Sequence, residues 1–283
     1  ELIEIDEQET QEICSEVSTF QKAIYSPSTA TIDPKIVMES LVKDVADLKI
    51  DLRMNTAFID KKNSTILTSS GDIESGYVIN AAGLYADKIA LMYGFSKDYR
   101  ILPFKGLYLY TNQKEFNLTT NVYPVPDLEN PFLGVHFTLD VNSKTKIGPT
   151  AIPAFWREQY SNFDNFNLSE SIEILFREAG LFLSNHFEFR KLAFEEIKKY
   201  SKKKMVYEAS KMVPTLNYHK LDSWGKPGIR AQLINISTKE LEMDFIYEGD
   251  DKSFHILNAV SPAFTCSKPF ADFLVKHISE LIR

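Results

Sequence analysis

Residues 77–90 read YVINAAGLYADKIA, and this stretch decides the fold. An apolar strand ends at Asn80, three small residues follow, and a helix begins directly after them. Because side chains this small leave the backbone open, another body can approach the turn closely. That body is either the helix packing on its own strand or the sugar and phosphates of a bound dinucleotide. The three small residues are Ala81, Ala82 and Gly83.

The bulk composition is that of an ordinary globular protein. The chain has 283 residues, of which 44% are hydrophobic and 25% are charged, so it is long enough to fold as one large domain or two smaller ones. A net charge of −7 argues against a nucleic-acid partner. The two cysteines, Cys14 and Cys266, lie far apart and match no metal-ligand spacing. We therefore predict a reducing compartment and no metal site.

Apolar periodicity and turn residues divide the chain into helices and strands. Residues 1–22 predict a polar helix, and an Asp-Pro pair beginning at Asp33 predicts the start of a helix over 34–47. Ser169 predicts the cap of a helical region over 169–212. A further helix is expected at 85–93, a turn at Gly71-Asp72, and strands at 50–54, 57–61, 64–69, 77–80, 103–111, 121–126, 132–140, 144–151, 228–235 and 254–258.

Residues 255–265 read HILNAVSPAFT and predict a strand that leads into the final helix. Ser261 is placed as its N-cap and Pro262 as its first residue. The first amides of a helix lack partners within the helix, so this end attracts negative charge. The alternative is a well-capped helix that binds nothing. The residues that would meet a ligand here are Ser261, Pro262, Ala263, Phe264 and Thr265.

Arg230 stands inside the apolar strand sequence GIRAQL, which begins at Gly228. An arginine is costly to bury without a partner, and its planar fork suits a carboxylate. A structural ion pair, a clamp on a substrate carboxylate and exposure at a sheet edge all remain open. Lys105 and Tyr108, on either side of Gly106, present the same alternatives.

His136 lies among strand residues in the sequence PFLGVHFT, which begins at Pro131. It is either a core histidine with its hydrogen bonds satisfied, or a polar group beside a reacting molecule. In the second case it would serve as donor or base.

Several segments in this order resemble the L-2-hydroxyglutarate dehydrogenase/oxidase branch of the FAD-dependent oxidoreductases related to D-amino-acid oxidase. The run Asn-Ala-Ala-Gly alone fits the whole superfamily. Tyr-Pro-Val-Pro, Leu-Gly-Val-His and Asn-Ala-x-Ser-Pro-Ala-x-Thr point to the narrower branch, and the resemblance runs from about Ile24 to the end of the chain. The segments are 79–87, 105–106, 122–126, 132–138, 147–151, 228–232 and 255–265.

The resemblance implies an α+β fold with an α/β-like cofactor domain and a mixed-sheet substrate domain. The cofactor domain would comprise residues 1–95 and 228–283, and the substrate domain residues 96–227. It also implies noncovalent FAD, oxidation of L-2-hydroxyglutarate to 2-oxoglutarate by hydride transfer to the flavin, and electrons leaving to oxygen or a membrane quinone pool. The expected location is the cytoplasm, with peripheral association at the inner face of the membrane where a quinone is the acceptor.

The resemblance also assigns residues to roles. Backbone near Ala57 would face the adenine end of FAD, and the small-residue turn Ala81–Gly83 its middle. The start of the final helix, Ser261–Thr265, would lie at the isoalloxazine, where its positive pole would stabilise the anion of the reduced ring. Arg230, with Lys105 and Tyr108 as weaker candidates, would meet substrate carboxylates. His136 is the candidate base.

One departure from the family limits these expectations. Nothing in the sequence reads G-x-G-x-x-G, the turn that holds the pyrophosphate in relatives. We therefore expect a C-terminal portion of a longer enzyme, without the first βαβ unit, that binds FAD poorly and is inactive alone. Two other functions remain open: an FAD-dependent oxidoreductase of an amine, an amino acid or glycerol phosphate, and a non-catalytic binding domain.

Overall fold

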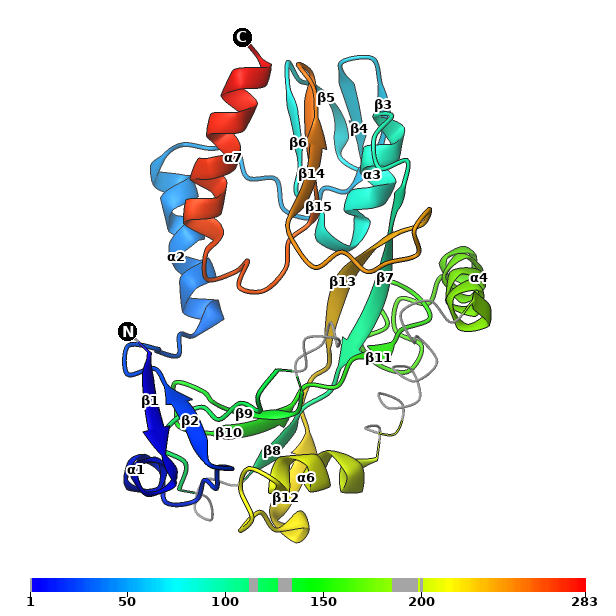
Figure 1. Ribbon diagram of the computed structural model, residues 1–283. Coiled ribbons are helices and arrows are strands. Elements are labelled where there is room, and N and C mark those ends of the chain that lie inside the picture. Colours follow the sequence, from blue (N-terminus) through cyan, green and yellow to red (C-terminus); the bar gives the residue numbers. More distant parts are fainter. Residues whose placement is uncertain (1, 112–116, 127–133, 185–197, 199–200) are drawn as a thin grey trace.

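Two units are stacked and joined by a pair of long strands in the computed structural model (Figure 1). The structure describes residues 2–111, 117–126, 134–184, 198 and 201–283. The joining strands, β7 (Tyr99–Gly106) and β13 (Gly228–Asn235), are antiparallel partners over their whole length. Strand β11 (Ile152–Pro153) pairs with the other edge of β7.

The upper unit contains a three-stranded sheet between two helices (Figure 1). Its strands are β6 (Val78–Asn80), parallel to β15 (Ser253–Asn258), and β14 (Ile246–Gly249), antiparallel to β15. Because side chains alternate along β15, Phe254 packs towards helix α7 (Ser267–Leu281) while Leu257 packs towards helix α3 (Ala86–Met92). The predicted sequence of strand, small-residue turn and helix is confirmed, with a single 3₁₀ turn, Gly83–Tyr85, between β6 and α3.

The rest of the upper unit follows local signals. Helix α2 (Pro34–Asp47) has the predicted bounds, and the Asp33 side chain accepts a hydrogen bond from the Lys35 amide at 2.8 Å. The expected strand over 50–54 is wrong, since these residues form no strand. Gly71-Asp72, expected as a turn, begins a strand instead. That antiparallel sheet comprises β3 (Phe58–Lys62), β4 (Thr65–Thr68) and β5 (Gly71–Glu74).

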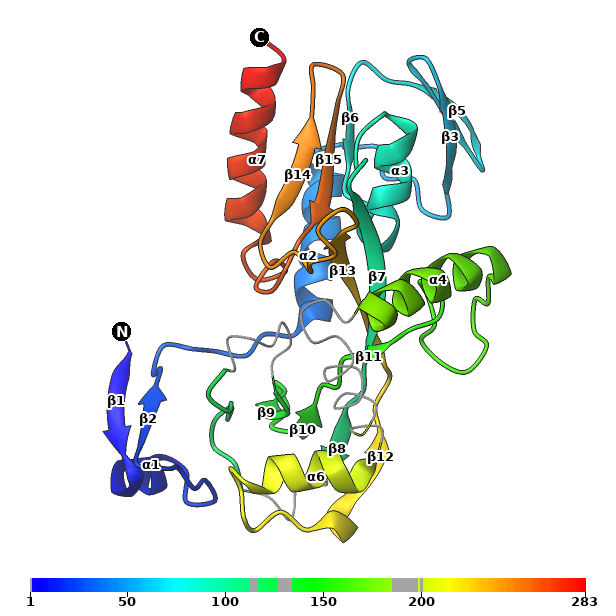
Figure 2. The ribbon, with the colours of Figure 1, turned by 45° about the vertical axis from the view of Figure 1, so that its right-hand side comes forward.

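The lower unit has a four-stranded antiparallel sheet with helix α6 (Lys202–Ser210) on one face (Figures 1 and 2). The other face is turned towards the upper unit (Figure 2). Leu109, Phe137 and Ile147 are buried against α6. In order across the sheet, the strands are β12 (Leu221–Trp224), β8 (Leu109–Thr111), β10 (Thr145–Gly148) and β9 (His136–Leu139).

The N-terminal residues differ from expectation. Residues 1–22 are not one helix: β1 (Ile3–Asp6), helix α1 (Glu7–Ile13) and β2 (Lys22–Tyr25) form a hairpin around a short helix. Cys14 and Val17, which follow this helix, join the core beneath the lower sheet. This segment therefore packs with the lower unit, although the sequence division places residues 1–95 with the cofactor domain. The other boundaries of that division stay a prediction.

The expected helical region 169–212 contains helix α4 (Leu168–Ser184) and α6, while residues 185–197 and 199–200 lie outside the described residues. Ser169 is not the cap; Asn167 Oδ1 accepts from the Glu170 amide at 3.1 Å. The expected strand 121–126 contributes one bridge, Val122 to Phe137. No described helix is long and apolar enough to cross a bilayer.

Candidate active site

Two cavities meet near the start of the joining strand β13, at the end next to the lower unit. The larger, about 690 Å³, is lined by the small-residue turn, by the segment after β15 and by the first turns of α7. The smaller, about 190 Å³, is lined by Phe104, Gly106, Tyr108 and the segment 149–151. Ile229 and Arg230 line both cavities. A side chain at this position can reach a ligand in either space.

The turn is shaped by Asn80, a residue that the sequence reasoning did not single out. Its Oδ1 accepts from the Ala82 amide at 3.1 Å, and its Nδ2 donates to the Ala86 carbonyl at 2.8 Å. With both ends of its amide engaged, Asn80 ties the strand to the helix and leaves Ala81 and Gly83 lining the larger cavity. Gly83 has φ +54°, a left-handed conformation that favours glycine.

Behind the turn, His255 is fully buried and neutral. Asn80 Nδ2 lies 3.1 Å from its Nδ1 and must donate, because the Asn80 oxygen is already fixed by Ala82. His255 Nε2 therefore carries the proton and donates to Ser253 Oγ at 3.1 Å. Burial lowers its pKa to about 4. This imidazole supports the turn as a neutral group.

The final helix begins later than the sequence predicted. Ser261 is not its cap and Pro262 is not its first residue, because 261–266 form turns in which Cys266 N donates to the Pro262 carbonyl at 3.0 Å. The helix starts at Ser267, and its first-turn proline is Pro269. Its first turns still line the larger cavity. Of the five residues expected at its start, Ser261 and Ala263 are among the lining residues, and Pro262, Phe264 and Thr265 are not.

Arg230 and Tyr108 share the smaller cavity. Arg230 lies opposite Phe104 in the β7–β13 pair, so both side chains belong to one face of the sheet. Burial lowers the pKa of the guanidinium, and burial raises the pKa of the Tyr108 hydroxyl, an effect that Arg230 opposes. The arrangement is a mostly apolar space with one cationic residue in its described lining, a suitable geometry for a small carboxylate.

Comparison with known proteins identifies the family. The model of the DAO family, described as FAD dependent oxidoreductase, matches residues 1–233. The chain belongs to this family. L-2-hydroxyglutarate dehydrogenase of Indibacter alkaliphilus is 34% identical over 252 residues, covering 87% of this chain and 62% of the relative. The enzyme of that name in Escherichia coli K12 is 30% identical over 268 residues, which cover 92% of this chain and 62% of the relative.

Solved structures show the same fold. L-alpha-glycerophosphate oxidase from Mycoplasma pneumoniae, with FAD bound, has a TM-score of 0.64 at 20% identity, covering 99% of this chain and 64% of its own. Glycine oxidase from Bacillus cereus has a TM-score of 0.58 at 14% identity, and the match covers 100% of this chain and 65% of the oxidase. The chain thus spans about three fifths of the length of the curated relatives and under two thirds of these structures.

The larger cavity suits the flavin half of the DAO family's cofactor. A planar ring system needs flat, largely apolar walls, which Ala81, Gly83, Ala263 and Phe270 provide. A pyrophosphate needs cations or a loop of free amides, and the sequence has no glycine-rich phosphate loop. Arg230 is the one cation in the described lining of this cavity, and the acidic Glu242 in the same lining opposes its attraction for phosphate. The described residues therefore fit the ring of FAD better than its phosphates.

Besides Pro262, Phe264 and Thr265, four other predicted site residues are absent from the described lining of either cavity, namely Ala82, Lys105, Ala57 and His136. Lys105 is buried, and the alternation of β7 turns it away from the face of Phe104 and Gly106. Ala57 bonds within the small sheet of the upper unit, where its amide donates to Ser69 Oγ at 2.9 Å.

The last of these is His136, which lies on β9 and is 8% exposed. Its Nδ1 donates to the Gly134 carbonyl at 2.9 Å, so Nε2 is the acceptor nitrogen of the neutral ring. Burial lowers the pKa of this imidazole, and its ring stacks on Tyr123 with centroids 4.5 Å apart. His136 is therefore a neutral ring with an acceptor nitrogen, outside the described lining of both cavities.

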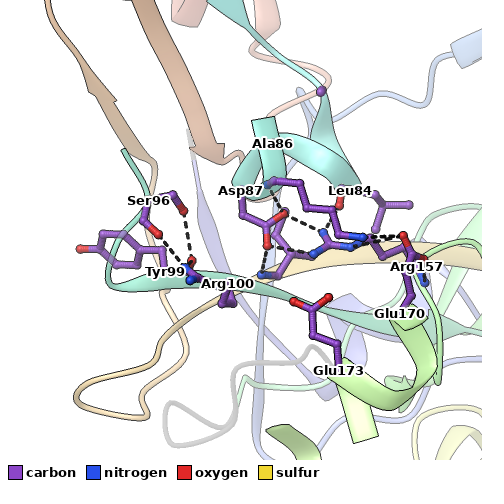
Figure 3. Close-up of polar contacts among 12 residues, drawn as sticks. Leu84, Ala86, Asp87, Ser96, Tyr99, Arg100, Arg157, Glu170 and Glu173 are labelled. Carbon is purple, nitrogen blue, oxygen red and sulfur yellow. Dashed lines mark hydrogen bonds and ion pairs between the residues drawn. The ribbon is translucent and has the colours of Figure 1, made fainter. Parts of the chain in front are cut away.

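A buried ion pair ties α3, and the turn before it, to the segment that follows β11 (Figure 3). Arg157, which follows β11, donates to both carboxylate oxygens of Asp87 on α3, at 2.7 and 2.9 Å, and to the Leu84 carbonyl. Both charged side chains are at most 1% exposed. Glu170 on α4 adds a second contact by pairing with Lys88 at 2.7 Å. This cluster fixes α3, and with it the turn, against α4.

Proposed function

We propose that the protein is an FAD-dependent oxidoreductase that oxidises L-2-hydroxyglutarate to 2-oxoglutarate. The curated relatives carry the name L-2-hydroxyglutarate dehydrogenase at 30–34% identity over most of this chain. The observation that supports it within the molecule is Arg230, which lines both cavities at their junction. The larger cavity fits the flavin ring and the smaller has the size of a five-carbon acid.

Arg230 is positioned to hold the carboxylate next to the reacting carbon. In a 2-hydroxy acid the hydroxyl-bearing carbon is bonded directly to a carboxylate. A guanidinium at the junction would therefore place that carbon at the edge of the larger cavity. Bound FAD supplies the acceptor for the hydride that leaves this carbon. Arg230 is exposed, so a substrate can reach its guanidinium, and a substrate that fills the mostly apolar cavity would displace water there and strengthen the ion pair.

The hydroxyl proton needs an acceptor, and His136 remains our proposal for this role. Its support is the neutral ring with Nε2 as the acceptor nitrogen, on the sheet face opposite α6. Replacing His136 with glutamine would remove the ionisation attributed to this base from the pH dependence of kcat. The electron acceptor, oxygen or a quinone, and peripheral membrane association stay predictions from the resemblance.

The test is oxidation of a substrate panel by the flavin-loaded full-length protein. Arg230→Met should lower kcat/KM for L-2-hydroxyglutarate by about 10- to 100-fold, the value of a charged hydrogen bond of about 1.5–3 kcal/mol. Arg53→Met, which changes an exposed arginine paired with Asp51, is the matched control and should keep wild-type kinetics. Activity on glycine or glycerol 3-phosphate, with none on L-2-hydroxyglutarate, would replace this function by one of the alternatives.

A further inference from the structure

We propose that Lys146 binds the second carboxylate of the substrate, the one remote from the hydroxyl, and so selects dicarboxylates over 2-hydroxy monocarboxylates. This inference rests on the proposed function. It assigns a role in substrate binding to a residue of the lower unit that belongs to none of the sequence motifs and to neither described cavity lining.

The position of Lys146 on its strand turns it away from the core. Its neighbours in β10, Thr145 and Ile147, are buried at 2% and 0% exposure, and Ile147 packs in the core under α6. Because side chains alternate, Lys146 projects from the opposite face. Its register partners on the two adjacent strands are Tyr110 and Thr138. Lys146 therefore shares the sheet face that is turned towards the upper unit (Figures 1 and 2).

Tyr108 connects Lys146 to the smaller cavity. The Lys146 ammonium lies 5.1 Å from the centroid of the Tyr108 ring, and Tyr108 lines the cavity together with Arg230. Arg230 interacts electrostatically with the same tyrosine. The two cations thus adjoin one aromatic side chain. Lys146 is also close enough to His136 to lower the pKa of that imidazole.

Among the described residues, no carboxylate pairs with the Lys146 ammonium. Two other partly buried lysines do have such partners: Lys88 pairs with Glu170 at 2.7 Å and Lys204 with Glu208 at 2.6 Å. Lys61 and Lys202 instead lie over tyrosine rings, as Lys146 does, but those tyrosines are in the described lining of neither cavity. Lys146 is half-buried with a tyrosine ring as its described contact. A half-buried ammonium whose described neighbours are aromatic or cationic is suited to receive a carboxylate from a ligand.

The chemistry of a five-carbon diacid matches this pair of cations. Its two carboxylates stand at opposite ends of a short chain. With one carboxylate on Arg230 and the hydroxyl-bearing carbon at the junction of the cavities, the chain would extend past Tyr108 and bring the other carboxylate towards Lys146. A monocarboxylate of the same length would leave a methyl group there and gain nothing from the ammonium. Selectivity would therefore come from one ion pair.

The test compares L-2-hydroxyglutarate with L-2-hydroxypentanoate, which has a methyl group in place of the second carboxylate. In the flavin-loaded full-length protein, Lys146→Met should lower the ratio of kcat/KM values, diacid over monoacid, at least tenfold through KM for the diacid. Lys146→Arg keeps the charge and should retain most of the ratio. Lys144→Met is the matched control, since the Lys144 ammonium lies 4.4 Å from the Tyr110 ring and has no assigned role.

The outcomes separate the two proposals. A wild-type enzyme that oxidises neither acid overturns the proposed function and this assignment together. A wild-type enzyme that prefers the diacid, with the same preference kept in Lys146→Met, overturns this assignment alone. An equal loss of preference in Lys144→Met would show a general effect of surface charge and would also overturn it. Flavin absorbance and thermal unfolding of each variant establish that it is folded.

Discussion

Lowering the pH should destabilise the folded protein through one buried histidine, His255. In the folded chain its Nδ1 accepts from Asn80 and its pKa is about 4, against an ordinary value of 6.5. Burial is the main cause, Lys61 adds to it, and Asp250 opposes it. The folded state therefore binds a proton more weakly than the unfolded state. Its contribution to stability is complete above pH 6.5 and is lost as the pH falls towards 4.

The size of the effect follows from the difference in pKa. Between pH 6.5 and pH 5 the unfolded chain binds this proton and the folded chain does not. Each pH unit then costs about 1.4 kcal/mol of folding free energy, which gives about 2 kcal/mol over that interval. A loss of this size is a substantial part of the roughly 5–15 kcal/mol that holds a typical domain folded.

The assay is urea unfolding at pH 7.5 and pH 5, for the wild type and for His255→Gln. Glutamine cannot take up a proton, so the variant shows how much the other ionisable groups change the free energy of unfolding between the two pH values. The variant will be less stable at both pH values, and only the change between them matters. The wild type should lose about 2 kcal/mol more than the variant on acidification. Equal losses would show that His255 titrates normally and would refute the reasoning.

Two other substitutions test the framework around the cavities. Arg157→Met should cost about 3–5 kcal/mol of unfolding free energy, because it leaves the Asp87 carboxylate buried without its partner; a loss below about 1 kcal/mol in chemical denaturation would contradict this. Gly148→Ala should cost at least about 2 kcal/mol, seen as a lower denaturation midpoint, since Gly148 has φ +144° and an added Cβ would lie 2.6 Å from the Leu107 carbonyl oxygen. An unchanged midpoint would show that the backbone there relaxes without strain.

Elements with local signals were predicted well from the sequence. Helix α2 has its predicted bounds because Asp33 and Pro34 define its start within two residues. Strand β13 also has its predicted bounds, 228–235. The N-terminal hairpin was missed because the pairing of Ile3 with Tyr25 depends on two distant strands meeting, and a polar run between them is typical of a helix. The same local signals placed the first residue of α7 at Pro262, five residues before its actual start at Ser267.

Only part of the candidate site could be predicted from the sequence. Arg230 stood out because a charged residue in an apolar strand is unusual. Arg157 gave no such signal, since its partner Asp87 is 70 residues away. Lys146 lies in the strand sequence TKIG, where an alternating lysine is typical of a solvated face. Its position beside Tyr108 emerges only when β8 and β10 are paired.

The two-strand ribbon of β7 and β13 has a mechanical consequence. Arg230 stands on this ribbon near the start of β13, opposite Phe104 on β7. If the two units rotate relative to one another about this ribbon, a residue on the ribbon is displaced less than the cavity residues that belong to either unit. The guanidinium would therefore keep its distance to a ligand in each chamber during opening and closing. Substrate could enter or leave without losing the alignment that sets its reacting carbon.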